Sequence, residues 1–286
     1  MSAQITAFFH KASSTYSYVV ADGATRRAAV IDPVLDYDAA SGRTATRSAQ
    51  AIVDHVRGAG LTLDWVLETH AHADHLSAAQ FIKQELGGTL AIGEGIRTVQ
   101  ATFAAIYGLG EGFSADGRQF DRLLKDGERF PIGELEVEVM AVPGHTSDSL
   151  AYRLGDAVFT GDTLFMPDSG TARCDFPGGD AGALYDSIQR ILALPEATRL
   201  YMCHDYGTGG REHMNETTVG EERRTNIHMK DGASRDAYVK LRRERDATLP
   251  VPALLLPAIQ VNIRAGRMPE PSADGTVYLR IPLNRF

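Results

Sequence analysis

Cysteine is scarce in this chain: only Cys174 and Cys203 occur among its 286 residues. So few cysteines exclude a scaffold held together by disulfides and indicate a reducing compartment, so we expect a cytoplasmic protein. No apolar run approaches the roughly 20 residues that span a bilayer. The N-terminus also lacks a basic stretch followed by an apolar core, which argues against a signal peptide. We therefore expect no membrane association.

Excess positive charge is also missing. The formal net charge is −8, from 29 lysines and arginines against 37 acidic residues. Proteins whose main ligand is nucleic acid usually carry a basic face, so this balance argues against nucleic acid as a partner. Hydrophobic residues make up 43% and charged residues 23% of the chain, as in ordinary globular domains.

Potential metal ligands are concentrated in one short segment. The sequence ETHAHADHL begins at Glu68 and directly follows the apolar run Trp65–Leu67. It places four ligand candidates within six positions: His70, His72, Asp74 and His75. Neutral imidazole is the commonest metal ligand, and carboxylate is its usual partner. The spacing H-x-H-x-D-H therefore predicts a metal site.

Further candidates follow other apolar runs. His145 comes after the alternating run Leu135–Val139, Asp162 after Ala157–Thr160, and His204 after Leu200–Cys203. Loops at strand ends converge in α/β architectures, so we expect these side chains to join the first cluster.

The hydrophobic periodicity predicts one α/β unit. We expect a sandwich over residues 1–210 and a C-terminal extension over residues 211–286 packed on the same domain. The expected strands are Ile5–Phe9, Tyr16–Ala21, Ala28–Asp32, Trp65–Leu67, Thr89–Ile92, Leu135–Val142, Leu150–Leu154, Ala157–Thr160 and Leu200–Cys203. The expected helices include Ala51–Val56, Leu76–Leu86, Ile96–Ile106, Ala181–Ala193 and an exposed Ser234–Arg245. We expect a loop insertion at Tyr37–Arg47 and an irregular, proline-containing arm at Leu249–Ile259. The arm, extended to Arg267, is the candidate contact of a homodimer.

The ligand motifs carry a resemblance that covers essentially the whole chain. THAHADH, PGHT, TGDT and CHDY, in that order, resemble the metallo-β-lactamase superfamily. The resemblance implies an αββα sandwich with the metal site at one edge, between the two sheets. It does not specify the reaction, because one fold hosts many activities.

The same resemblance implies two possible metal sites. In a dinuclear zinc site, His70, His72 and His145 would hold one ion. Asp74, His75 and His204 would hold the other, with Asp162 as the bridge. In a mononuclear site, only His70, His145 and Asp162 bind the metal and carry the catalysis. Two imidazoles and one carboxylate are the usual platform of non-haem Fe(II) oxygenases.

Segments outside the ligands favour the mononuclear alternative. Asp162–Gly179, Met202–Tyr206, Gly220–Asn226 and Pro257–Gly266 resemble the bacterial persulfide dioxygenases. That resemblance implies one Fe(II) per chain and oxidation of glutathione persulfide by O2 to sulfite and glutathione. It also implies substrate contacts at Arg173 and Tyr206, and Arg211 and Lys230 are weaker candidates of the same kind.

Two other functions stay open at this point. A hydroxyacylglutathione hydrolase of the glyoxalase II type would use the same ligands with two zinc ions and would not consume O2. A non-catalytic persulfide sensor would use Cys174 and Cys203 as a redox pair. RNA processing is disfavoured by the acidic charge balance.

Overall fold

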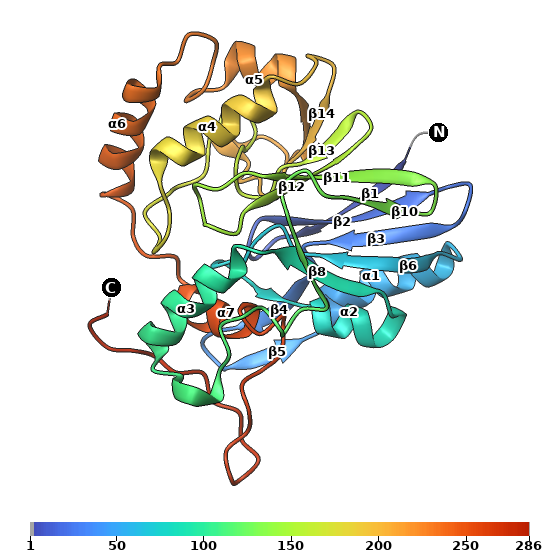
Figure 1. Cartoon of the computed structure of the whole chain (residues 1–286), viewed down its shortest axis with the longest axis vertical. Helices are drawn as coiled ribbons and strands as arrows, with labels where there is room; N and C mark the ends of the chain where they lie inside the picture. The colour runs from blue at the N-terminus through green and yellow to red at the C-terminus, as the bar shows by residue number, and fades with distance from the viewer. Residues whose placement is uncertain (1–2, 286) are drawn as a thin grey trace.

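Two six-stranded sheets face each other in the computed structural model, which describes residues 3–285 (Figure 1). The first sheet has the order β1-β2-β3-β6-β8-β9 and the second the order β10-β11-β12-β13-β14-β15. Helices α1, α2, α3 and α7 cover the outer face of the first sheet, and α4, α5 and α6 cover that of the second (Figure 1). The predicted α/β class and αββα sandwich are therefore confirmed.

The strands and helices have the following bounds. The first sheet contains β1 (Gln4–His10), β2 (Thr15–Asp22), β3 (Arg27–Ile31), β6 (Thr62–Leu67), β8 (Thr89–Gly93) and β9 (Arg122–Leu124). The second contains β10 (Arg129–Ile132), β11 (Leu135–Ala141), β12 (Leu150–Leu154), β13 (Ala157–Phe159), β14 (Arg199–Tyr201) and β15 (Glu216–Thr218). The α-helices are α1 (Arg47–Gly58), α2 (Ala79–Leu86), α3 (Ile96–Tyr107), α4 (Ala181–Leu192), α5 (Val219–Thr225), α6 (Arg235–Asp246) and α7 (Leu255–Asn262).

Strand alternation creates the layers. Side chains point to opposite faces at successive strand positions. In β2, Tyr16 and Tyr18 join the buried cluster between the sheets, whereas Val19 joins the cluster under the helices of the first layer. A third buried cluster lies between the second sheet and α4. Among the described helices, none has the length and apolar character needed to cross a membrane.

Two predicted irregular segments are partly regular. The predicted loop Tyr37–Arg47 instead contains a hairpin between β4 (Val34–Asp38) and β5 (Arg43–Ala45), and β4 also pairs with β7 (Leu76–Ser77). The strands are short and partly exposed, so their composition resembles that of a loop. Because residues 76–77 form β7, the helix predicted from Leu76 begins at Ala79.

The predicted irregular arm contains α7. Pro257 lies in the first turn of this helix, where a missing N–H removes no intrahelical hydrogen bond. Ala258, Ile259 and Val261 are buried in the chain's own core, so this part of the arm is not free for a partner. The homodimer itself stays a prediction. Helix α6 is also less exposed than predicted, because Tyr238 and Arg242 are buried.

Candidate metal centre

Strand ends deliver the ligand candidates to one edge of the sandwich. Asp32, immediately after β3, fixes the start of the histidine segment after β6. Its carboxylate accepts hydrogen bonds from the Thr69 backbone N–H at 2.7 Å and from the Thr69 hydroxyl at 2.8 Å. On the other sheet, Gly144 has φ +139°, and a Cβ atom there would lie 2.3 Å from the Leu184 backbone N. A glycine is therefore needed for α4 to pack against the loop that carries His145.

His70, His145 and Asp162 form one group. Their ligand atoms lie within 4.8 Å of one another, and all three residues are buried. Asp162 Oδ2 is 3.9 Å from His70 Nε2 and 3.7 Å from His145 Nε2. His145 Nδ1 is 2.7 Å from the Arg173 carbonyl, which accepts its proton. The proton therefore sits on Nδ1, and the Nε2 lone pair points toward Asp162.

His70 also carries its proton on Nδ1. Its Nδ1 lies 3.0 Å from the Thr69 hydroxyl oxygen, and that hydroxyl donates its own proton to Asp32. Nδ1 is therefore the donor, and Nε2 carries the free lone pair. Buried His70 Nε2 has no hydrogen-bond partner among the described residues. An unpartnered buried imidazole nitrogen beside a carboxylate fits a bound cation.

His72 is oriented differently from its neighbours. Its Nε2 lies 3.0 Å from Asp32 Oδ1 and 3.6 Å from Glu68 Oε2. Burial lowers the pKa of His72, but the Asp32 and Glu68 carboxylates outweigh this effect and raise the pKa to about 10. The His72 ring centroid is 4.0 Å from that of His70, yet His72 does not share the group of His70, His145 and Asp162.

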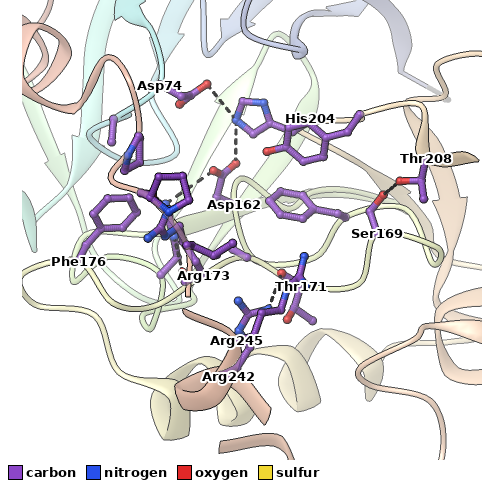
Figure 2. A pocket seen from close by; sticks show the side chains of 18 of the residues that line it. Asp74, Asp162, Ser169, Thr171, Arg173, Phe176, His204, Thr208, Arg242 and Arg245 are labelled. Carbon is purple, nitrogen blue, oxygen red and sulfur yellow. Dashed lines mark hydrogen bonds and ion pairs between the residues drawn. The ribbon is translucent and has the colours of Figure 1, made fainter. Parts of the chain in front are cut away.

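A second group lies on the other side of Asp162. Asp162 Oδ1 is 3.3 Å from His204 Nε2, and Asp74 Oδ2 is 3.4 Å from the same nitrogen (Figure 2). His75 Nε2 is buried and has no hydrogen-bond partner among residues 3–285. His72, Asp74 and His75 place ligand atoms within 4.8 Å of one another. The structure thus places His72 with Asp74 and His75, and not with His70 and His145 as the dinuclear alternative implied. Asp162 directs Oδ2 at His70 and His145 and Oδ1 at His204.

Asn262, at the end of α7, braces residues 68–77, called the ligand loop here, by hydrogen bonds to their backbone. Its side-chain N–H groups donate to the His72 carbonyl at 2.7 Å and the His75 carbonyl at 2.8 Å. Its Oδ1 accepts from the Ser77 backbone N–H at 2.8 Å. Local sequence pattern gave no signal for this role, because the contact joins residues 185 or more positions apart.

An open cavity of about 820 Å³ leads to the ligand groups. Asp162, His145 and His204 line one part of it, and the arm segment Leu249–Ala253 forms a wall. Figure 2 places Arg242 and Arg245 at the opposite end of the view from Asp74 and His204. Phe165 and Phe176 add apolar surface. The cavity is large enough for a tripeptide thiol rather than only a small anion.

The predicted substrate contacts occupy different environments. Tyr206 lines the cavity and is 54% exposed. Arg173 also lines it, but its guanidinium binds Asp175 and donates to the Pro250 carbonyl at 2.8 Å, so it holds the arm in place. Arg211 is paired with Asp168 and Asp205.

Arg211 and Lys230, the weaker candidates for substrate contacts, do not line the cavity. The Lys230 side chain is exposed outside it. The pairing that occupies Arg211 could not be read from the sequence. Arg245, which sequence reasoning missed, lines the cavity and forms no ion pair with any described residue. Its place on the charged face of α6 made it indistinguishable from a solvated surface residue.

The motif Gly220–Asn226 supports the cavity wall. Asn226 Nδ2 donates to the Gly170 carbonyl at 3.1 Å and to Glu222 Oε2 at 2.6 Å. Gly170 lies between Ser169 and Thr171, which both line the cavity. Glu222 is fully buried and forms no ion pair within the part of the chain that the structure describes, and burial raises the pKa of its carboxyl to about 8.

We expect Glu222→Gln to stabilise the metal-free protein at pH 8 but not at pH 5. The Glu222 pKa rises from 4.5 to about 8 on folding, so wild-type stability is lost as pH rises through this window. Glutamine keeps the acceptor for Asn226 and does not titrate. The gain at pH 8 is on the order of 4 kcal/mol, measured by denaturant unfolding at both pH values. An equal effect at the two pH values would contradict the assigned pKa.

Comparison with known proteins identifies relatives along nearly the whole chain. The sequence profile of the metallo-beta-lactamase superfamily matches residues 10–204. A protein of Burkholderia pseudomallei (strain 1710b), named probable metallo-hydrolase, is 49% identical over 98% of this chain and 99% of its own. A beta-lactamase hydrolase-like protein of Xylella fastidiosa (strain Temecula1) is 50% identical, and the match spans 65% of its length.

Similarity also extends to the persulfide dioxygenases. The mitochondrial persulfide dioxygenase ETHE1 of Bos taurus is 32% identical over 92% of this chain and 89% of its own. The crystal structure of ETHE1 from Myxococcus xanthus superimposes with a TM-score of 0.74 at 32% identity, covering 92% of this chain and 100% of that chain. Both hydrolase and dioxygenase names therefore occur among the relatives.

Proposed function

The chain belongs to the metallo-beta-lactamase superfamily, and on that premise we propose that it is a persulfide dioxygenase. It oxidises glutathione persulfide with O2 to sulfite and glutathione, using one Fe(II) per chain. The reaction balances when one persulfide anion, one O2 and one water give one glutathione, one sulfite dianion and one proton.

The observation that carries this proposal is the separation of His72 from His70, His145 and Asp162. Two imidazoles and one carboxylate converge, while the third imidazole is directed at Asp32. This donor set suits Fe(II) and leaves coordination positions for other ligands. When bound there, the iron supplies redox chemistry toward O2 and a binding position for the anionic sulfur.

The chain's own residues orient and enclose the substrate. The Arg173 carbonyl fixes the His145 ring, and the Arg173 side chain holds the Pro250 segment of the cavity wall. Phe165 and Phe176 give the cavity that Asp162 also lines two aromatic, apolar surfaces. Arg245 lines the cavity without an ion-pair partner among the described residues, and its guanidinium is suited to a glutathione carboxylate.

A dinuclear zinc hydrolase is the second candidate. Asp162 faces His204 through Oδ1 and the pair His70 and His145 through Oδ2, as a bridging carboxylate would. Asp74 and His75 form a second group of donors with His72. Two zinc ions would generate a hydroxide that attacks a thioester of glutathione.

The sensor function has less support. Cys174 is buried, and its burial next to Asp246 raises its pKa to about 12. Cys203 is buried as well, and burial raises its pKa well above the ordinary value. Thiols held in the neutral form react slowly with persulfides and oxidants.

One experiment separates the two enzymatic candidates. Protein is purified without air or chelator, its metal content is measured, and O2 uptake is followed with glutathione persulfide. About one iron per chain with persulfide-dependent O2 uptake supports the dioxygenase. About two zinc ions, no O2 uptake and cleavage of lactoylglutathione would move the assignment to the hydrolase.

Replacing Arg245 with alanine is expected to raise KM for glutathione persulfide by roughly tenfold or more and to change kcat little. The variant loses a charge-assisted contact to a part of the substrate remote from the reacting sulfur. Steady-state O2 uptake measures both constants. Arg243→Ala on the exposed side of the same helix is the matched control, and an equal rise in KM for both variants would contradict the assignment.

A further inference from the structure

A second cavity, of about 500 Å³, lies away from the ligand groups. It is formed by the segment that follows α3 and by the chain from Gln260 to Arg280. No residue lining it also lines the metal-centre cavity. In Figure 1, α7 and the C-terminal segment, which contribute to it, lie on the outer side of the first sheet.

Three arginines line this cavity without forming an ion pair. Arg264, Arg267 and Arg280 form no ion pair with any described residue, and Glu270 is the one acidic side chain in the lining. The chain as a whole carries a net charge of −8, so a cavity lined by three arginines and one acidic residue runs against its average composition. Clustered guanidinium groups repel one another and are retained at a cost.

The guanidinium groups are anchored, yet most of their donors stay available. Arg264 Nη1 donates to the Gln260 carbonyl at 2.5 Å, Arg267 Nη1 to the Gln119 carbonyl at 3.3 Å, and Arg280 Nη1 to the Gly108 carbonyl at 3.1 Å. Within residues 3–285, the Nε and Nη2 groups of these three arginines have no hydrogen-bond acceptor. The Nη1 hydrogen bond of each arginine therefore holds its guanidinium group in the cavity lining and leaves the Nε and Nη2 donors available.

The walls hold the arginines in place. The Gln260 side chain donates to the Arg280 carbonyl and accepts from the Arg280 N–H, both at 2.8 Å. The Arg264 guanidinium lies 4.9 Å from the centre of the Phe113 ring. Burial and the nearby Arg280 charge lower the pKa of Arg264, with Glu270 and Tyr107 opposing this. Tyr278, 56% exposed, completes the lining with an open aromatic face.

We propose that this cavity is a second binding site, for a small molecule that carries a phosphate or a similar dianionic group. Planar guanidinium forks match the oxygens of such a group bidentately, and the anion neutralises the repulsion among the three arginines. The Tyr278 ring offers a stacking surface to a ligand that also contains a flat ring. The site does not depend on the reaction at the metal centre.

Calorimetric titration of the iron-loaded protein at low salt tests this site, with inorganic phosphate, ADP and adenosine as probes. We expect saturable binding of phosphate or ADP, and at least roughly tenfold weaker binding by Arg264→Gln and by Arg280→Gln. Arg243→Gln removes the same charge from exposed α6 and is expected to bind like wild type. Melting temperatures identify unfolded variants, for which Arg267→Gln is the substitute.

The outcomes separate the possible ligands. Equal affinity for phosphate and ADP assigns recognition to the dianion alone, and tighter ADP binding adds the ring contact at Tyr278. Either result supports the site. It is overturned by the absence of saturable phosphate or ADP binding up to about 10 mM, by unchanged binding in folded variants, or by adenosine binding as tightly as ADP.

Discussion

Asp162→Ala is expected to leave the protein without bound iron and to reduce persulfide-dependent O2 uptake to below about one thousandth of the wild-type rate. Asp162 Oδ2 faces both His70 Nε2 and His145 Nε2, so its removal takes the only carboxylate from their group. Two neutral imidazoles alone hold Fe(II) weakly. Metal analysis after gel filtration and O2-electrode measurements give the two readouts.

Asp74→Asn is the matched control for this variant. It changes a carboxylate on the other side of Asp162, 3.4 Å from His204 Nε2, and keeps the residue's shape. For a mononuclear site we expect about one iron per chain and a rate within roughly tenfold of wild type. Loss of half of the bound metal and of all activity in Asp74→Asn would show that the second group binds a catalytic ion.

Asn262→Ala is expected to weaken iron binding by about 10- to 100-fold, although the hydrogen bonds of the Asn262 side chain go to backbone groups of the ligand loop. The substitution leaves the His72 and His75 carbonyls and the Ser77 N–H, all buried, without their partner. Unpaired buried groups destabilise the conformation that requires them. The ligand loop therefore loosens, and competition with a chelator measures the change in affinity.

Gln260→Ala separates this effect from general destabilisation. Gln260 lies on the same helix, is buried, and binds the Leu256 and Arg280 carbonyls rather than the ligand loop. We expect it to lower the melting temperature while iron affinity stays near the wild-type value. Equal iron affinity in the two variants would mean that Asn262 serves the fold in general.

Much of the sandwich could be predicted because its strands alternate strictly or are fully buried. Leu135–Ala141 alternates toward the space between the sheets, and each ligand candidate follows such a strand. The prediction of a loop was wrong at Arg43–Ala45, because this short edge strand is largely exposed and has few apolar residues. At Leu255–Asn262, prolines suggested an irregular segment, although one of them lies in a permitted first-turn position.

At the metal centre, too, some features could be predicted from the sequence and others could not. Ligand types and spacing singled out His70, His145 and Asp162, which lie in one group, since these are properties of short segments. The orientation of His72 toward Asp32 and the bracing by Asn262 depend on contacts between distant segments. Arg173 and Arg211 show the same limit, because their pairing with Asp175 and Asp168 decides what their charge can do.

The bracing of the ligand loop by Asn262 also sets an order of events during protein synthesis. Asn262 is added 185 residues after Ser77, an interval of roughly 10–40 s at ribosomal rates. The histidine segment leaves the ribosome well before the helix that secures it. A metal ion that binds during that interval meets a loop whose His72 and His75 carbonyls still lack the Asn262 contact. The affinity of the folded centre for its ion is therefore reached only after α7 docks.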